Sequence, residues 1–127
     1  MKKISVYIVF ALLLFNACNN TETVYTPYAT GKATWYGPGF QGKPTASGEK
    51  FNKRDLTAAH RTLKFGTKLR VTNLRNKKQV IVRVNDRGPV SGRFIIDLSQ
   101  KAAKKIDMID AGVVPVKLEI IKERKQK

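Results

Sequence analysis

Short runs of alternating apolar and polar positions recur between residues 33 and 121. Val80, Val82 and Val84 occupy every second position of one run, and Leu69 and Val71 do so in another. A period of two is typical of strands with one buried face. The runs are bounded by turn residues, and together they predict six strands, at residues 33–36, 56–59, 68–72, 79–84, 94–96 and 116–121.

One segment has helical spacing instead. Ser99 is a suitable N-cap for a short helix that runs to about Ile106, with Ala102, Ala103 and Ile106 on its inner face and lysines on the other. Six short strands and one helix predict a mainly β fold. A small closed barrel is the arrangement we expect, because closure leaves no sheet edge exposed.

The same pattern outlines the domain organisation. We expect one folded domain at residues 31–121 and no second or appended glycan-binding domain. Residues 18–30 show neither period and are interpreted as a tether, and residues 122–127 as a basic tail. Glycines and prolines concentrate in residues 37–48, and a loop of that length in a small domain is usually functional or mobile.

The first residues indicate export. Lys2 and Lys3 precede an apolar run at residues 4–15, which is shorter than the roughly 20 residues that a membrane-spanning helix needs. We therefore interpret residues 1–17 as a signal peptide. The only cysteine, Cys18, follows in the sequence Phe-Asn-Ala-Cys, which resembles a bacterial lipobox. A lipid anchor at Cys18 is the prediction, and a free or intermolecular thiol is the alternative.

The charge points to an anionic partner. The chain has 25 basic and nine acidic residues, and removal of Lys2 and Lys3 leaves a net charge of +14. For an exported protein this favours carboxylate-bearing wall glycan or anionic lipid, with no role for nucleic acid. The alternative is that the lysines only keep a small protein in solution.

Four motifs in a fixed order resemble the rare lipoprotein A (RlpA) family. They are Ala-Thr-Trp-Tyr-Gly at 33–37, Thr-Ala-Ser-Gly-Glu at 45–49, Leu-Thr-Ala-Ala-His at 56–60 followed by Phe-Gly-Thr at 65–67, and Val-Asn-Asp-Arg-Gly-Pro at 84–89. Ile-Asp-Leu-Ser at 96–99 is a further match. Each motif alone is weak, whereas all of them in register are specific. The resemblance implies a double-psi β-barrel, consistent with the six strands above.

The resemblance also implies an activity. Such proteins are lytic transglycosylases that cut the bond between N-acetylmuramic acid (MurNAc) and N-acetylglucosamine (GlcNAc), leave a 1,6-anhydro product, and tend to prefer strands without stem peptides. Two alternatives stay open: a non-lytic wall-binding module of the expansin kind, and a basic protein that only tethers membrane to wall. We expect a monomer without a cofactor, on the periplasmic side of the outer membrane if the organism has one, since Asn19 is not the Asp associated with inner-membrane retention.

Carried over by motif, the catalytic residues are Glu49, His60 and Asp86. Glycoside cleavage needs a carboxylic acid to protonate the leaving oxygen, and Asp86 is predicted for that role because it lies at the end of a strand. Strict alternation places Asp86 on the face of Val84 and Arg83 on the opposite face. Repulsion from a nearby Glu49 is then expected to keep Asp86 protonated.

Each of these residues has a simpler reading. Asp86 could only form a turn, Glu49 could be a solvated loop charge, and His60 could be satisfied by backbone groups. As the only histidine, His60 would need carboxylates to complete a zinc site, so we assign no metal. The predicted substrate-binding residues are Trp35, Tyr36, Ser47 and Arg87, with one of the two aromatic side chains outward and the other in the core.

Overall fold

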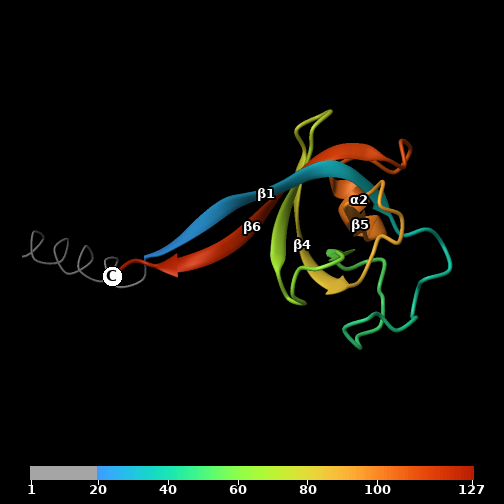
Figure 1. The fold of residues 1–127 in the computed structure, drawn as a ribbon, viewed down its shortest axis with the longest axis horizontal. Coiled ribbons are helices and arrows are strands. Elements are labelled where there is room, and N and C mark those ends of the chain that lie inside the picture. Colours follow the sequence, from blue (N-terminus) through green and yellow to red (C-terminus); the bar gives the residue numbers. More distant parts are fainter. Residues whose placement is uncertain (1–19) are drawn as a thin grey trace, which may run out of the picture. The chain divides into compact units, whose positions relative to one another are not determined.

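The computed structural model describes residues 20–127 as six strands and one short helix (Figure 1). The predicted signal peptide and Cys18 lie outside the described residues. Each predicted strand overlaps an observed one, so the prediction of a mainly β fold is confirmed. In chain order the elements are β1 (Thr21–Trp35), β2 (Thr57–Ala59), β3 (Lys68–Asn73), β4 (Gln79–Asp86), β5 (Ile96–Leu98), α2 (Gln100–Lys105) and β6 (Val114–Lys125).

The strands close into a barrel in the order β1-β5-β2-β4-β3-β6. Two pairs, β1 with β5 and β2 with β4, are parallel, and the pairs β2 with β5, β3 with β4 and β3 with β6 are antiparallel. Closure brings segments distant in sequence side by side, such as Ala33 of β1 and Ile96 of β5. The predicted closed barrel is confirmed.

The barrel interior is filled by the residues that the alternation selects. Val80, Val82, Val84, Leu69 and Val71 are all buried in one cluster. The helix adds the three residues predicted for its inner face, Ala102, Ala103 and Ile106. Removing such a side chain would cost its transfer free energy and leave a cavity in a closely packed interior.

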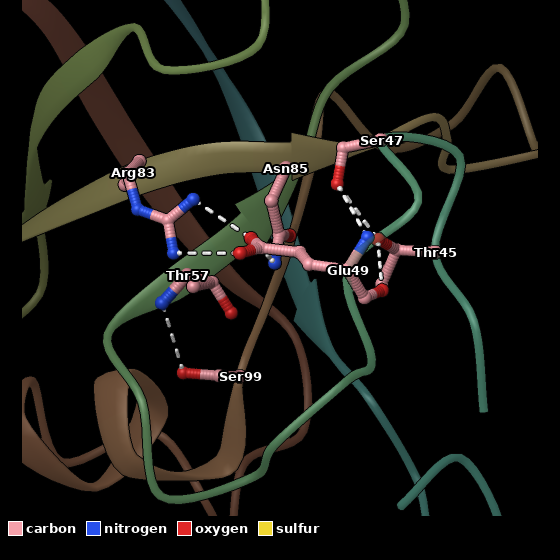
Figure 2. Close-up of polar contacts among 7 residues, drawn as sticks. All are labelled: Thr45, Ser47, Glu49, Thr57, Arg83, Asn85 and Ser99. Carbon is pink, nitrogen blue, oxygen red and sulfur yellow. Dashed lines mark hydrogen bonds and ion pairs between the residues drawn. The ribbon is translucent and has the colours of Figure 1, made fainter. Parts of the chain in front are cut away.

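Ser99 caps α2 as predicted and also ties the helix to β2. Its Oγ accepts the N–H of Ala102 at 3.2 Å and that of Thr57 at 3.4 Å, and donates to the carbonyl of Asp55 at 2.6 Å. Figure 2 shows the contact with Thr57. The start of the helix and the start of β2 are therefore held together by one hydroxyl group.

The ends of the chain differ from the sequence prediction. Residues 21–30, expected to be an irregular tether, belong to β1, and residues 122–125 of the expected tail belong to β6. Most side chains in these two stretches are exposed, so they lack an apolar pattern. Strands can pair without an apolar pattern, because the hydrogen bonds between them join main-chain groups. Sequence periodicity therefore could not detect these strand extensions.

The described residues divide into two compact units. Residues 20–24 with Lys122–Lys127 form one, in which the N–H of Gln126 donates to the carbonyl of Asn20 at 3.2 Å. Tyr25–Ile121 form the other and hold the apolar core. Between residues 20 and 127, no helix is both long and apolar enough to cross a bilayer.

Candidate functional site

Two carboxyl groups lie in one row across the barrel wall. Ala59 of β2 pairs with Asp86 of β4 on one side and with Asp97 of β5 on the other. Thr34 of β1 pairs with Asp97 and extends the row. Cross-strand partners point to the same face, and strands lie about 4.8 Å apart, so one strand, or about 10 Å, separates the two aspartate Cα atoms.

This row lies on the face opposite the main core. The preceding pair along these two strands, Ala58 with Val84, points into the core. The register then shifts between Ala58 and Ala59. Ala59 therefore pairs with Asp86 and not with Asn85. The irregularity reverses the alternation of β4 at its last residues. The prediction that Asp86 shares the face of Val84 is therefore wrong, although Asp86 does end its strand as predicted.

Asp86 is held by three hydrogen-bond donors. The Tyr36 hydroxyl donates to Oδ2 at 2.6 Å, and the N–H groups of Ala46 and Arg87 donate to Oδ1 at 2.9 and 2.8 Å. Burial, and then the bond to Asp86, raise the pKa of Tyr36, so its hydroxyl remains a donor. Two of the three donors come from distant segments. The contacts of Asp86 therefore go beyond those of a residue that only forms a turn.

Asp97 has a different environment. Its Oδ1 accepts the Thr34 hydroxyl at 3.2 Å. Burial raises the pKa of Asp97 to about 6, helped by the charge of Asp86 and opposed by the Thr34 bond. The sequence analysis did not select this residue. An acidic side chain between two apolar residues of a short strand, Ile96 and Leu98, was the signal that could have found it.

His60 contacts Asp86 through the main chain: its N–H donates to the Asp86 carbonyl at 3.1 Å. The ring Nδ1 accepts the N–H groups of Thr62 and Leu63, each at 3.1 Å. A neutral imidazole that accepts at Nδ1 carries its proton on Nε2. Burial, followed by the charges of Arg61 and Arg87, lowers the pKa of His60. His60 is thus a neutral ring with a donor at Nε2, and backbone groups satisfy it on its other side.

The Glu49 carboxylate is bound by the Arg83 guanidinium and the Asn85 amide. Arg83 donates to its two carboxylate oxygens at 2.7 and 3.3 Å, and Asn85 Nδ2 donates at 2.6 Å (Figure 2). These bonds, that of Arg83 first, lower the pKa of Glu49. Arg83 therefore pairs with the Glu49 charge that was expected to repel Asp86. Over residues 20–127 no three His, Cys, Asp or Glu side chains gather at one possible metal site.

The four predicted substrate-binding residues serve different purposes. Trp35 packs against the main core, whereas Tyr36 follows it on the other face and stacks on Phe51 at 4.4 Å. Ser47 shares a hydroxyl contact of 2.9 Å with Thr45. Arg87 donates to the carbonyls of the loop that follows β2 and lies 4.0 Å from the Phe65 ring. Their contact with substrate stays a prediction.

A groove lies beside Trp35 and Tyr36. One cavity of about 340 Å³ is lined by Trp35, Tyr36 and the loop that follows them, and another of about 500 Å³ is lined by α2 and by residues before β2. Lys53 and Gln100 line both, so the two cavities are adjacent. In the part of the chain that the structure describes, no basic residue of the second cavity forms an ion pair. We call this second cavity the basic groove; its bases are Lys53, Arg54, Lys101 and Lys104.

Solved structures with a similar fold include two types of protein. The Streptomyces papain inhibitor superposes with a TM-score of 0.58 at 25% identity, covering 79% of this chain and 94% of the inhibitor. An expansin of Clavibacter michiganensis superposes with a TM-score of 0.59 at 24% identity, covering 81% of this chain and 53% of the expansin. The expansin likeness concerns the fold alone.

Sequence relatives are more similar. The endolytic peptidoglycan transglycosylase RlpA of Campylobacter jejuni is 60% identical over 93 residues, which are 73% of this chain and 34% of that protein. The protein of the same name from Neisseria meningitidis is 50% identical over 92 residues, 72% of this chain and 38% of that protein. The chain thus matches little more than a third of the length of these relatives. The sequence pattern of the lytic transglycolase family matches residues 28–118. The chain therefore belongs to this RlpA-like family of double-psi β-barrels.

Proposed function

We propose that the chain is an endolytic peptidoglycan transglycosylase, which cleaves the MurNAc–GlcNAc bond of glycan strands to 1,6-anhydro-MurNAc ends. The observation that carries this proposal is the placement of Asp86 and Asp97 in one row on one face. Two carboxyl groups in different environments suit the two proton transfers that the reaction needs. The names of the family and of its curated members support the same reaction.

The structure favours dividing the two transfers between the acids. Asp97, whose raised pKa of about 6 keeps more of it protonated than an ordinary aspartic acid at the same pH, gives its proton to the glycosidic oxygen as the bond to MurNAc C1 breaks. The 6-hydroxyl of the same sugar then attacks C1 and gives its proton to the carboxylate of Asp86. Return of that proton to Asp97 through solvent restores both groups, and no water is consumed.

The other residues bind and orient. The Nε2–H group of neutral His60 is a donor for a sugar oxygen. The basic groove offers cations to the lactyl carboxylate that each MurNAc carries when its peptide is removed. We therefore place strands without stem peptides, as the preferred substrate, along the groove.

Mass spectrometry of digested sacculi and of naked glycan tests the proposed reaction. We expect muropeptides and disaccharides with 1,6-anhydro ends, and their molecular mass is lower by one water than that of hydrolysis products. Reducing ends would indicate a hydrolase. Binding without any cleavage would favour a non-lytic module of the expansin type.

Binding to glycan should be weak and sensitive to salt. Contacts between exposed lysines and carboxylates are screened over a Debye length of about 8 Å at physiological ionic strength. Co-sedimentation with purified glycan across a salt series measures this. The double variant Lys101→Glu/Lys104→Glu should lose most of the salt-sensitive binding, whereas Lys64→Glu/Arg75→Glu, with the same net charge, should retain it. Equal losses in the two variants would contradict a role for the basic groove.

We further propose a lipid anchor at Cys18, from the sequence of the preceding residues. Metabolic labelling with a fatty-acid analogue should tag the wild-type protein, and globomycin should block its processing. Cys18→Ser should abolish both the label and the membrane fraction. A label that persists in this variant would remove the assignment.

A further inference from the structure

We propose that Glu49 and Arg83 form a latch that holds the turn of residues 45–48 against Asp86, so that Glu49 is a positioning residue and not a proton carrier. The latch consists of the Glu49 carboxylate, the Arg83 guanidinium and the Asn85 amide (Figure 2). Its effect on cleavage rests on the proposed function. Its effect on the geometry around Asp86 does not.

The anchoring half of the latch is part of the barrel wall. Arg83 lies in β4 and pairs with Thr57 of β2 on one side and Lys68 of β3 on the other. Its N–H is also bonded, to the carbonyl of Leu56 at 3.1 Å. The backbone that carries Arg83 and Asn85 is thus fixed by neighbouring strands. Both side chains meet Glu49 on the outer face of β4.

The other half is a tight turn that ends at Glu49. The carbonyl of Glu49 accepts the N–H and the hydroxyl of Thr45, at 2.8 and 2.7 Å. Within the turn the N–H of Gly48 donates to the Thr45 carbonyl at 3.0 Å, and Gly48 has a φ of +92°, which favours glycine. Because these bonds make the turn one compact piece, fixing the Glu49 side chain fixes the whole turn.

The turn reaches Asp86 on its far side. Ala46 N–H donates to Asp86 Oδ1 at 2.9 Å, and Ser47 N–H donates to the Asn85 carbonyl at 3.3 Å. The turn therefore contacts the end of β4 at residues 83, 85 and 86. Without the bond from Glu49 to Arg83, only the Asn85 amide and the two backbone contacts would keep Ala46 on the carboxylate.

The chemistry of Glu49 also suits a latch. A carboxylate with two guanidinium contacts and one amide contact has little capacity left to move a proton, and these partners lower its pKa. The Arg83 and Glu49 side chains are about 40% exposed, at 42% and 41%. Such a surface pair contributes little to global stability. Its loss should therefore act locally, on the turn and on Asp86.

The Ala46 amide tests the geometry without any measurement of activity. In the wild type, ¹H–¹⁵N NMR should show slow exchange of this amide and the downfield proton shift of a hydrogen-bonded N–H. Arg83→Ala should speed its exchange about tenfold or more, as expected when a local contact opens, and should move the proton shift upfield. Arg75→Ala removes an exposed arginine outside the latch and should change neither property. Unchanged exchange and an unchanged shift in Arg83→Ala would overturn the latch.

Cleavage assays test its consequence. Glu49→Gln keeps one oxygen that can accept both Arg83 Nη1 and Asn85 Nδ2 and loses only the longer Arg83 contact, so kcat should fall only a few-fold. Glu49→Ala and Arg83→Ala should each lower kcat about tenfold or more by misplacing Asp86. The exchanged pair Glu49→Arg/Arg83→Glu should recover part of the loss. If Glu49 carries a proton, Glu49→Gln will instead lose about 10²–10⁴-fold, and the latch role is overturned. A wild type without anhydro products would refute the proposed function, and the amide measurements would still decide the latch.

Discussion

Asp86→Asn is expected to lower the rate of anhydro-product formation on naked glycan by about 10²–10⁴-fold, the usual contribution of general acid–base catalysis. The amide oxygen can still accept the Ala46 and Arg87 N–H groups, and the amide NH2 can donate to the Tyr36 oxygen, but the amide cannot take up the proton of the sugar hydroxyl. The fold and most of the glycan binding should be preserved. Circular dichroism and co-sedimentation would establish this before rates are compared.

Arg87→Lys is the neighbouring control. The Arg87 side chain donates to the carbonyls of His60 and Leu63 and not to the Asp86 carboxylate. Lysine should therefore weaken the loop after β2, or glycan binding, more than the chemical step. Equal rates for the wild type and Asp86→Asn would eliminate Asp86 from the mechanism.

Asp97→Asn should have two opposite effects, a loss of activity and a gain in stability. The variant cannot protonate the glycosidic oxygen, so cleavage should again fall about 10²–10⁴-fold. In the wild type, cleavage should decline as pH rises through about 6, because the folded chain then loses the Asp97 proton. A rate that stays constant from pH 5 to pH 8 would contradict this assignment.

The gain in stability follows from the same raised pKa. Between the ordinary pKa of 3.8 and the folded value of about 6, the folded state binds more protons at Asp97 than the unfolded state does. Stability therefore falls as pH rises through this window and stays lower above it. A shift of roughly two units corresponds to at most about 3 kcal/mol, so Asp97→Asn should gain about 1–3 kcal/mol at pH 7. Urea unfolding measures this, and the difference should disappear near pH 3.

The sequence predicted the fold well wherever a periodic pattern coincides with burial. Val80, Val82 and Val84, and the capped helix after Ser99, were located correctly because each contributes an apolar face to one core. The strand extension at residues 21–30 was missed because exposed paired strands have no such face. The sequence pattern thus predicts strands whose side chains pack in the core. It does not predict strands that only form backbone hydrogen bonds with a neighbouring strand.

The candidate site was predicted less completely. Motifs located Asp86, His60 and Glu49, but the face of Asp86 depends on a register shift opposite Ala59, which no alternation rule contains. Asp97 gains its raised pKa from burial and from Asp86, which lies eleven positions earlier in the sequence, with one strand between them in the barrel. Glu49 meets Arg83 only after the loop has folded back. These are properties of the closed barrel, so sequence spacing alone could not predict them.

The register shift beside Ala59 also means that the same strands carry two sets of residues under different constraints, one set that fills the core and one that faces outward. Inward residues such as Val84, Leu98 and Ala58 fill the core, while their outward neighbours Asp86 and Asp97 are free of that constraint. Lineages could therefore exchange the outward set without losing the ability to fold. A papain inhibitor and an expansin on similar frames, at a quarter identity or less, illustrate such divergence. A library randomised only at the outward positions would explore new chemistry on an intact scaffold.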